Sequence, residues 1–313
     1  MSKATTSRVI DDLRFSIIIP CLNRRDDLRA ALRSCIQQTF SKFEIVVIDD
    51  CSELPLADIC QEFGDARISC YRSSVNIGPA RSRNIGIARS RGEYVSFLDS
   101  DDLYLPHRLE LLDRLIRSNS EPSDILIHRQ KRVISAEGLG LMMPKNLPSR
   151  DQRLDEYVFL YGNWLQTNSF VVRRELAQTI KFDPECALYE DTKYIIQCWL
   201  VSDNVVATDE VLSIFNDFRT NLRVSRHRSF GRIQSMLAFT EEHCSQRANL
   251  AFQAFACGEK VFRKQPLHVI WTIWEGYRAG TPVSRCFIYL CRSMFGSALV
   301  DSAVNSARRK LLS

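Results

Sequence analysis

Three aspartates lie close together in the stretch YVSFLDSDDLY, which runs from Tyr94 to Tyr104. Asp99, Asp101 and Asp102 would repel one another at neutral pH unless solvent, basic side chains or a metal ion offset their charge. Clustered carboxylate oxygens are hard ligands that suit Mg²⁺ or Mn²⁺, and an ion so bound can also neutralise a diphosphate group. Taken alone, the stretch is more typical of a solvated turn that caps the next helix.

A second pair of acids, Glu190 and Asp191, stands about ninety positions further along the chain in the stretch YED. A carboxylate that faces an attacking hydroxyl can act as a general base and remove its proton. Two acids at the start of a helix are, by themselves, usually capping residues. The catalytic interpretation of this pair therefore depends on the motifs upstream.

The elements that position these acids are predicted clearly in the first hundred residues. Short apolar runs typical of buried strands alternate with stretches in which apolar residues recur at helical spacing. We predict strands at 15–19, 43–49, 67–71 and 94–98, and helices at 25–38, 55–63 and 79–90. This alternation indicates a parallel sheet covered by helices on both faces.

In such sheets ligands bind beyond the carboxyl ends of the strands. PCLNR follows the first predicted strand, DDCS the second and DSDD the fourth, so we expect these polar groups to meet at one edge. The sequence contains no GxGxxG after the first strand and no GxxxxGK[ST], the two motifs that commonly hold nucleotide phosphates. A bound nucleotide must be held in another way.

The second half of the chain follows a looser pattern. We predict a helix in PHRLELLDRLIRSN, a strand pair or an edge strand in DILIHRQKRVIS, a loop in GLGLMMPKNLPSR and a helix in EDTKYIIQCWL. After about Phe230 the pattern is helical. The expected fold class is α/β with a Rossmann-like, mainly parallel sheet, and the expected domains are 1–229 and a helical carboxyl-terminal region, 230–313.

Composition places the chain among ordinary soluble globular proteins. Its 313 residues are 45% apolar and 25% charged, with a formal net charge of +5 and no long basic run of the kind that binds nucleic acid. The eleven cysteines are scattered without a CxxC pair, which favours small buried hydrophobic side chains in a reducing cytosol. No apolar leader and no run of about 18 apolar residues is present, so we expect a cytoplasmic protein.

The carboxyl-terminal stretch is basic and aromatic. From Glu259 onward nine basic residues stand against three acidic ones, interleaved with the runs VIWTIW and CFIYLCRSMF. Such a pattern suits helices that lie in an anionic membrane interface, here the cytoplasmic face of an inner membrane. It suits equally a helical subdomain packed on the catalytic body.

The order of strand, PCLNR, helix, strand, VIDDCS and then NIGPARSRNIGIARSRGEYVSFLDSDD resembles the family 2 glycosyltransferases, which have the GT-A fold. The resemblance covers roughly 15–226 and is most specific at 76–102. It implies transfer of a sugar from a nucleotide donor, usually a UDP-sugar, to a hydroxyl of a glycan or lipid-linked glycan, with inversion at the anomeric carbon. It also implies a divalent metal, Mg²⁺ or Mn²⁺, and a role in bacterial exopolysaccharide or surface-glycan biosynthesis.

The resemblance also assigns roles by position. Pro20 and Asn23 lie in the first nucleotide loop, and Asp49 and Asp50 match the acidic pair around the uracil. Arg81 matches a basic residue near the base and phosphates. Asp99 faces the ribose, and Asp101 binds the metal with Asp102 as a competing ligand. The aromatic residue that often precedes the loop asparagine is Leu22 here.

On the acceptor side, the resemblance makes Asp191 the general base and Glu190 the fallback. One departure concerns the metal. Where the family commonly has a histidine after the base helix, this chain has Asn221, a weaker ligand, so Arg219, Arg223 or Arg226 could carry phosphate charge instead. Trp164 could pack against a sugar face or belong to the core.

Two other functions fit parts of the pattern. A non-catalytic nucleotide-sugar-binding or scaffold subunit would keep the fold, although intact Asp99, Asp101 and Asp191 favour catalysis. A nucleotidyltransferase would require a glycine-rich, lysine-containing first loop, which PCLNRRDD does not supply.

Overall fold

The apolar run at the amino terminus of the fold becomes β1 (Phe15–Cys21). In the computed structural model, which describes residues 13–217, 230–256, 266–295 and 300, β1 pairs in parallel with β2 (Phe43–Asp49) on one side and β4 (Tyr94–Phe97) on the other. Every residue of β2 and β4 is buried. Strands covered on both faces read as continuous apolar runs, which is why the sequence predicted them well.

The sheet has nine strands in the order β3-β2-β1-β4-β8-β6-β9-β5, with β7 paired to β6. The remaining strands are β3 (Ile68–Arg72), β5 (Leu103–Tyr104), β6 (Ile125–Val133), β7 (Gly140–Met143), β8 (Phe170–Arg173) and β9 (Val205–Asn216). The half from β3 to β4 is parallel, whereas β8 joins β4 and β6 antiparallel. The expectation of a loop throughout GLGLMMPKNLPSR is corrected, because Gly140–Met143 within it form β7 against β6.

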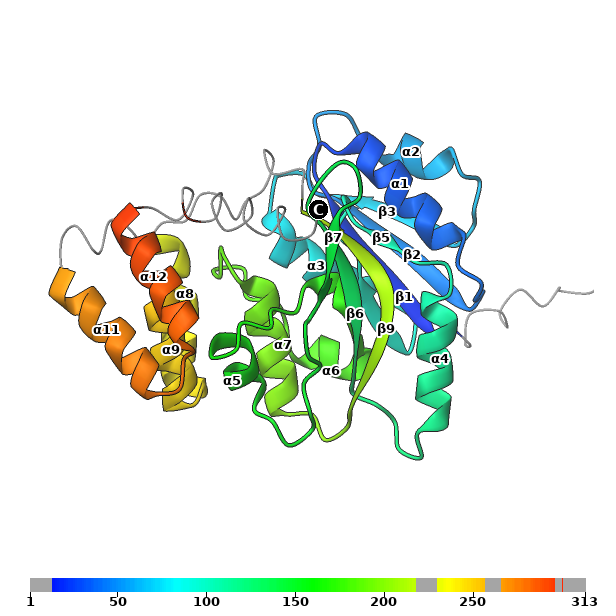
Figure 1. Cartoon of the computed structure of the whole chain (residues 1–313). Coiled ribbons are helices and arrows are strands. Elements are labelled where there is room, and N and C mark those ends of the chain that lie inside the picture. Colours follow the sequence, from blue (N-terminus) through cyan, green and yellow to red (C-terminus); the bar gives the residue numbers. More distant parts are fainter. Residues whose placement is uncertain (1–12, 218–229, 257–265, 296–299, 301–313) are drawn as a thin grey trace, which may run out of the picture. The chain divides into compact units, whose positions relative to one another are not determined.

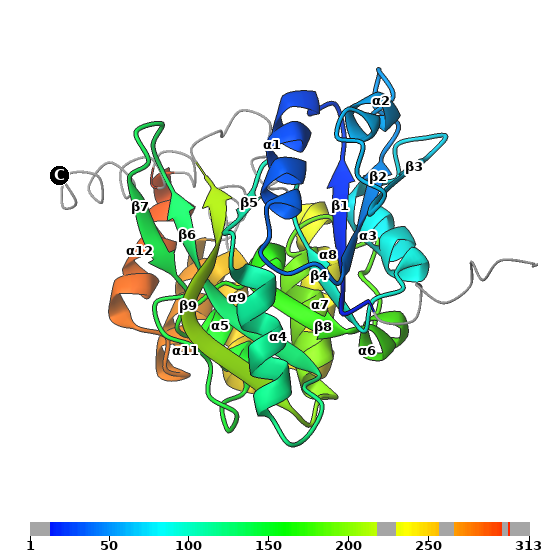
Figure 2. The same ribbon diagram turned by 90° about the vertical axis from the view of Figure 1, so that its right-hand side faces the viewer.

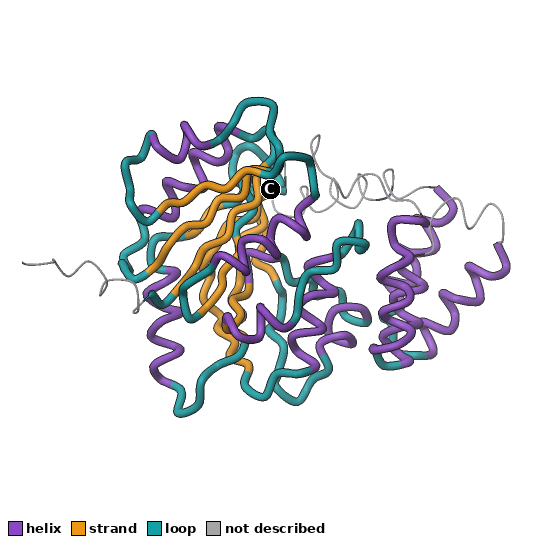
Figure 3. The backbone as a smooth tube through the Cα atoms, turned by 180° about the vertical axis from the view of Figure 1, so that it is seen from behind, coloured by secondary structure: helices purple, strands orange, loops and turns teal. Residues whose placement is uncertain are grey.

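Helices cover both faces of this sheet, as predicted (Figures 1 and 2). One face carries α1 (Arg25–Ile36), α2 (Ala57–Gln61) and α4 (Arg108–Ser118). The other carries α3 (Gly78–Arg89), α6 (Arg174–Thr179) and α7 (Glu190–Leu200). Figure 3 shows the strands as one continuous layer between these helices. The α/β class is confirmed.

An aromatic cluster fixes the end of β4 and the start of α7. Phe97 contacts Phe170, Phe182 and Tyr194 edge-on, with ring centroids 5.2–6.0 Å apart. Phe182 and Tyr194 stack at 3.9 Å. Buried aromatic pairs contribute beyond their area alone. The strand that carries the three aspartates and the helix that carries the second acidic pair are thus packed together.

The described residues divide into two compact units. The sheet and its helices lie in the first, made of 1–149, 165–184 and 190–222, and the second is made of 150–164, 185–189 and 223–313. The second unit contains α5 (Leu154–Phe159), α8 (Phe230–His243), α9 (Gln246–Ala256), α11 (Pro266–Arg278) and α12 (Val283–Phe295). The functional boundary at 229/230 stays a prediction.

Within the second unit, the segment of α5 is fastened to the start of α9. The buried carboxylate of Asp155 accepts a hydrogen bond from the backbone N–H of Ser245 at 2.6 Å, and Ser245 Oγ accepts one from the N–H of Ala248 at 3.1 Å. Ser245 Oγ also donates to Glu156 at 2.9 Å. This arrangement satisfies free backbone donors at the start of α9.

Candidate active site

The carboxyl end of β4 delivers the three aspartates into different surroundings. Asp99 Oδ1 accepts a hydrogen bond from Arg83 Nη2 at 2.7 Å, and Asp99 Oδ2 accepts a longer one from Thr167 Oγ1 at 3.4 Å. Burial raises the pKa of Asp99, but the charge and hydrogen bond of Arg83, the charge of Arg24 and the hydrogen bond of Thr167 together outweigh this effect, and the net pKa lies below the ordinary value. Asp99 is therefore ionised.

Asp101 is paired with a cation from the first loop. Its Oδ2 lies 2.6 Å from Arg24 Nη1, and both side chains are largely buried. Arg24 directly follows Asn23, in the PCLNR segment after β1. The repulsion expected between neighbouring carboxylates is thus offset by a separate arginine at each of Asp99 and Asp101.

Asp102 makes structural hydrogen bonds. It is 2% exposed, its Oδ2 accepts from Asn168 Nδ2 at 2.8 Å, and its Oδ1 accepts from the backbone N–H of Asn216 at 2.9 Å. Asn168 lies in the short 3₁₀ helix Thr167–Ser169, directly before β8. Since β8 runs antiparallel to β4, its start meets the end of β4, and Asp102 joins this meeting point to the end of β9.

Arg83 is the residue that the sequence interpretation missed. It is 4% exposed and donates to Asp99 and, at 3.1 Å, to Glu190 Oε1. Arg81, the predicted basic residue, lies on the exposed side of the same helix. Ala80 and Ile87 are buried beside Arg83. Residues three and four apart share a helix face, so the helical spacing of Ala80, Arg83 and Ile87 is the sequence signal by which Arg83 could have been found.

Glu190 and Asp191 begin α7, where the helix dipole favours negative charge. Burial, reinforced by the charge of Glu190 and opposed by that of Arg83, raises the pKa of Asp191 to about 7. A carboxylate with a pKa near the working pH is suited to general-base chemistry. Arg83, Asp99, Glu190 and Asp191 thus form one charged cluster contributed by α3, β4 and α7.

The loop after β1 is held to the loop after β2 by Asn23. Its backbone N–H donates to Ser52 Oγ at 3.0 Å, and its Oδ1 accepts from the N–H of Glu53 at 2.7 Å. Asn23 has a φ of 55°, in the left-handed region that asparagine tolerates better than most residues. Pro20 precedes it within β1. The predicted pairing of these two loops at one sheet edge is present.

The acidic pair after β2 organises the loops around it. Asp49, buried in β2, accepts hydrogen bonds from the N–H groups of Ser52 and Leu56 at 2.8 and 3.1 Å, and from Arg72 Nη1 at 2.8 Å.

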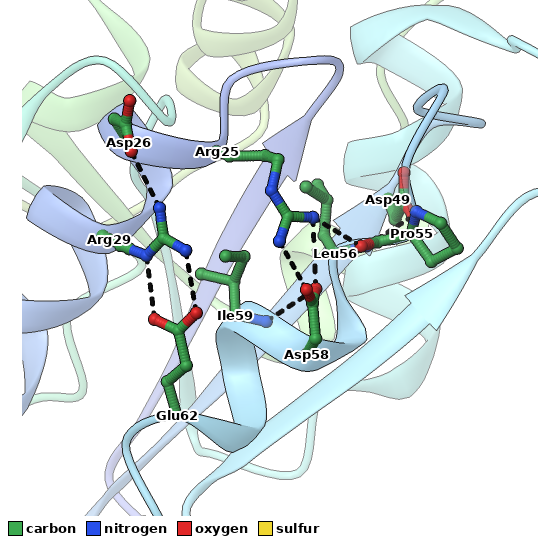
Figure 4. Close-up of polar contacts among 9 residues, drawn as sticks. All are labelled: Arg25, Asp26, Arg29, Asp49, Pro55, Leu56, Asp58, Ile59 and Glu62. Carbon is green, nitrogen blue, oxygen red and sulfur yellow. Dashed lines mark hydrogen bonds and ion pairs between the residues drawn. The ribbon is translucent and has the colours of Figure 1, made fainter.

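Figure 4 shows Asp49 with Leu56. It also shows two ion pairs, of Arg25 with Asp58 and of Arg29 with Glu62, which join α1 to the segment of α2.

Asp50, the second acid of the pair after β2, contacts the start of α3. Its two oxygens accept hydrogen bonds from the backbone N–H groups of Ile77 and Gly78 at 2.7 and 2.9 Å. Burial raises the pKa of Asp50, with these two bonds acting in the opposite direction. Each oxygen of Asp50 accepts one of these hydrogen bonds and retains a second lone pair that can accept from a ligand.

The residues present suit a divalent cation in part. In the described ranges, no three His, Cys, Asp or Glu side chains are arranged to hold a metal ion. Asp101 nevertheless offers carboxylate oxygen, the ligand type that Mg²⁺ and Mn²⁺ prefer. It already forms an ion pair with the positively charged side chain of Arg24. Asp102 fits less well, since both its oxygens accept protein hydrogen bonds. Asn221 and the arginines Arg219, Arg223 and Arg226 lie outside the described residues.

Trp164 belongs to the second unit. Its ring stacks on Tyr189 with centroids 5.4 Å apart and also contacts Phe159 and Phe255. These contacts favour the interpretation of Trp164 as a core residue over that of a sugar platform.

Residues 16–137 match the family model described as glycosyl transferase family 2. The chain is 28% identical over 188 residues to the amylovoran biosynthesis glycosyltransferase AmsB of Erwinia amylovora. This match covers 58% of this chain and 62% of that protein. It is 32% identical over 111 residues to the UDP-Glc:alpha-D-GlcNAc-diphosphoundecaprenol beta-1,3-glucosyltransferase WfgD of Escherichia coli, covering 36% and 44%. The match to AmsB thus spans less than two thirds of that relative's length.

Two solved structures share the fold. Staphylococcus aureus TarS 1-349 in complex with UDP-GlcNAc superposes with a TM-score of 0.64 at 18% identity, over 94% of this chain and 92% of that one. The mannosyltransferase PcManGT of Pyrobaculum calidifontis, in complex with GDP-Man and Mn²⁺, gives 0.51 at 14% identity, over 96% and 81%. The predicted GT-A type of fold is confirmed.

Proposed function

Because residues 16–137 form a glycosyl transferase family 2 domain, we propose that this protein transfers a sugar from a UDP-sugar to a hydroxyl of a glycan or lipid-linked glycan, with inversion at the anomeric carbon. The observation that carries the proposal is the charged cluster of Arg83, Asp99, Glu190 and Asp191, in which one carboxyl has a pKa of about 7 beside an ionised one. The names of AmsB and WfgD support a role in polysaccharide biosynthesis.

In the proposed reaction Asp191 takes the proton of the acceptor hydroxyl. The freed oxygen forms a bond to the anomeric carbon on the face opposite the nucleotide, while the bond from that carbon to the diphosphate oxygen breaks. UDP then leaves carrying the electron pair. Glu190 holds Arg83, and its negative charge raises the proton affinity of Asp191.

The donor nucleotide is proposed to lie along the loops after β1, β2 and β4. Asp50 can accept a hydrogen bond from the base, whereas Asp49 acts by shaping the loop, since its oxygens are engaged by Ser52, Leu56 and Arg72. Asp99 faces the ribose. Mg²⁺ or Mn²⁺, bound by Asp101, would neutralise charge on the leaving diphosphate. The Mn²⁺ named for PcManGT supports this assignment.

The test is release of UDP from a panel of UDP-sugars, with and without a membrane extract that supplies acceptor. Acceptor-dependent UDP release that Asp191→Asn abolishes supports the proposal. A non-catalytic nucleotide-sugar-binding subunit would instead show a UDP-dependent rise in melting temperature with no release of UDP from any donor. The acceptor on diphosphoundecaprenol in the name of WfgD supports inclusion of lipid-linked glycans in the panel.

A further inference from the structure

The helices α11 and α12 carry large apolar side chains on their exposed faces. On α11, Trp271, Trp274 and Tyr277 are 54%, 55% and 45% exposed, and on α12, Val283, Phe287 and Met294 are 65%, 66% and 45% exposed. These six residues are called the α11–α12 surface below. Single exposed apolar residues are common on proteins, but a group that contains five large aromatic or sulfur-containing side chains on neighbouring helices marks an interaction site.

The opposite faces of both helices already form the core of the second unit. Val269 and Ile273 of α11 and Cys286 and Tyr289 of α12 are buried together against Ala254 of α9. A helix that needs only one apolar face to pack has polar residues on the other. Here the outward face is apolar as well, so the packing of the described residues does not account for it.

The exposed residues follow helical spacing and therefore share a face. Trp271 and Trp274 are three apart, as are Trp274 and Tyr277, and Val283 and Phe287 are four apart. The two helices lie side by side in Figure 1, joined by the short connection 279–282.

The chemistry of the surface fits the headgroup region of a membrane. Tryptophan and tyrosine combine an apolar ring with a polar N–H or O–H group, and they gather where hydrocarbon meets water. In the sequence, 259–313 carries nine basic residues against three acidic ones, an excess of positive charge that anionic lipid headgroups attract. No described helix has both the length and the apolar character needed to cross a bilayer, so contact would be along the surface.

We propose that the α11–α12 surface binds an anionic lipid bilayer at its headgroup level. The proposal stands on the surface itself and does not require the activity proposed above. Other occupants, such as a second copy of this chain, are separated from it by the test.

The experiment is co-sedimentation of the full chain with vesicles of phosphatidylcholine alone or with 30% phosphatidylglycerol added. The wild type is expected to bind the anionic vesicles more tightly, and Trp271→Ala/Trp274→Ala is expected to bind them roughly tenfold more weakly, since two half-buried large side chains are removed. Leu200→Ala/Val201→Ala is the matched control, because it removes two exposed apolar residues from the first unit. An unchanged melting temperature verifies that each variant is folded.

Equal binding of the wild type to both kinds of vesicle, or unchanged binding of the tryptophan variant, overturns the proposal. A dimer that the tryptophan variant converts to a monomer, with no vesicle binding by the wild type, overturns it in favour of contact between copies. Vesicle binding without any UDP release would leave this inference standing and refute the proposed activity.

Discussion

Arg83 Nη2 lies 2.7 Å from Asp99 Oδ1, and the same guanidinium reaches Glu190 Oε1 at 3.1 Å. One buried cation thus joins the carboxylate at the end of β4 to the acid that opens α7. A buried arginine between two carboxylates holds these elements at a set separation, since loss of the cation would leave negative charges uncompensated.

Asp191→Asn is expected to lower kcat by about 10²- to 10⁴-fold, the usual contribution of a general base. Stabilisation by UDP should be retained, because the residue faces the acceptor in the proposed reaction. Steady-state UDP release and thermal unfolding measure the two effects. Asp183→Asn is the control, since Asp183 also pairs near α7, with Lys193 at 2.6 Å, but has no proposed role in transfer. Wild-type kcat in Asp191→Asn would remove this residue as the base.

Activity is expected to rise with pH through about 7 and then level off, because the base must be ionised and the pKa of Asp191 is raised to about 7. Stability follows the opposite direction. A carboxyl with a raised folded pKa stabilises the fold below its unfolded value near 4, and this contribution is lost as pH rises through about 7. Between pH 5 and pH 8, the free energy of unfolding measured with urea should fall more for the wild type than for Asp191→Asn. The same change in both proteins would contradict the raised pKa.

Arg83→Met is expected to destabilise the fold by about 3–5 kcal/mol, the cost of breaking a buried ion pair. Arg81→Met, on the exposed side of the same helix, should change stability by about 0.5 kcal/mol or less. Urea unfolding measures both. In addition, the charge of Arg83 lowers the pKa of Asp191, so any activity left in Arg83→Met should require higher pH. Equal effects of the two variants would argue against the central position of Arg83.

Asp101→Ala and Asp102→Asn are expected to fail in different ways. A ligand at about 100 times its Kd stabilises the folded protein by about 2.7 kcal/mol in total. Asp101→Ala should remove most of the part of the stabilisation by UDP that depends on Mn²⁺. Asp102→Asn should lower stability by about 1–3 kcal/mol, because its partners Asn168 and Asn216 lose a charged acceptor, while the folded protein still responds to UDP with Mn²⁺. Thermal shifts with UDP, with and without Mn²⁺, distinguish the two. The reverse pattern would make Asp102 the metal ligand.

The sequence by itself determined the alternating elements of the amino-terminal half. The strand predicted at 43–49 is β2 to the residue, and the helix predicted at 79–90 is α3 shifted by one. Apolar periodicity reports local structure, and the rule for parallel sheets then brings the ends of β1, β2 and β4 to one edge. The positions of Asp99, Asp101, Glu190 and Asp191 at strand and helix ends followed from these local patterns.

Only the tertiary structure decided which partner each acid has. Asp102 meets Asn216, 114 residues away, because β9 ends beside the turn after β4, and no local pattern encodes that contact. The antiparallel entry of β8 between β4 and β6 was also outside what periodicity reports. The raised pKa of Asp191 depends on burial and on the charges of Glu190 and Arg83, and Arg83 comes from more than a hundred residues upstream. Electrostatics act through space, so these properties arise only once the sheet and its helices have packed.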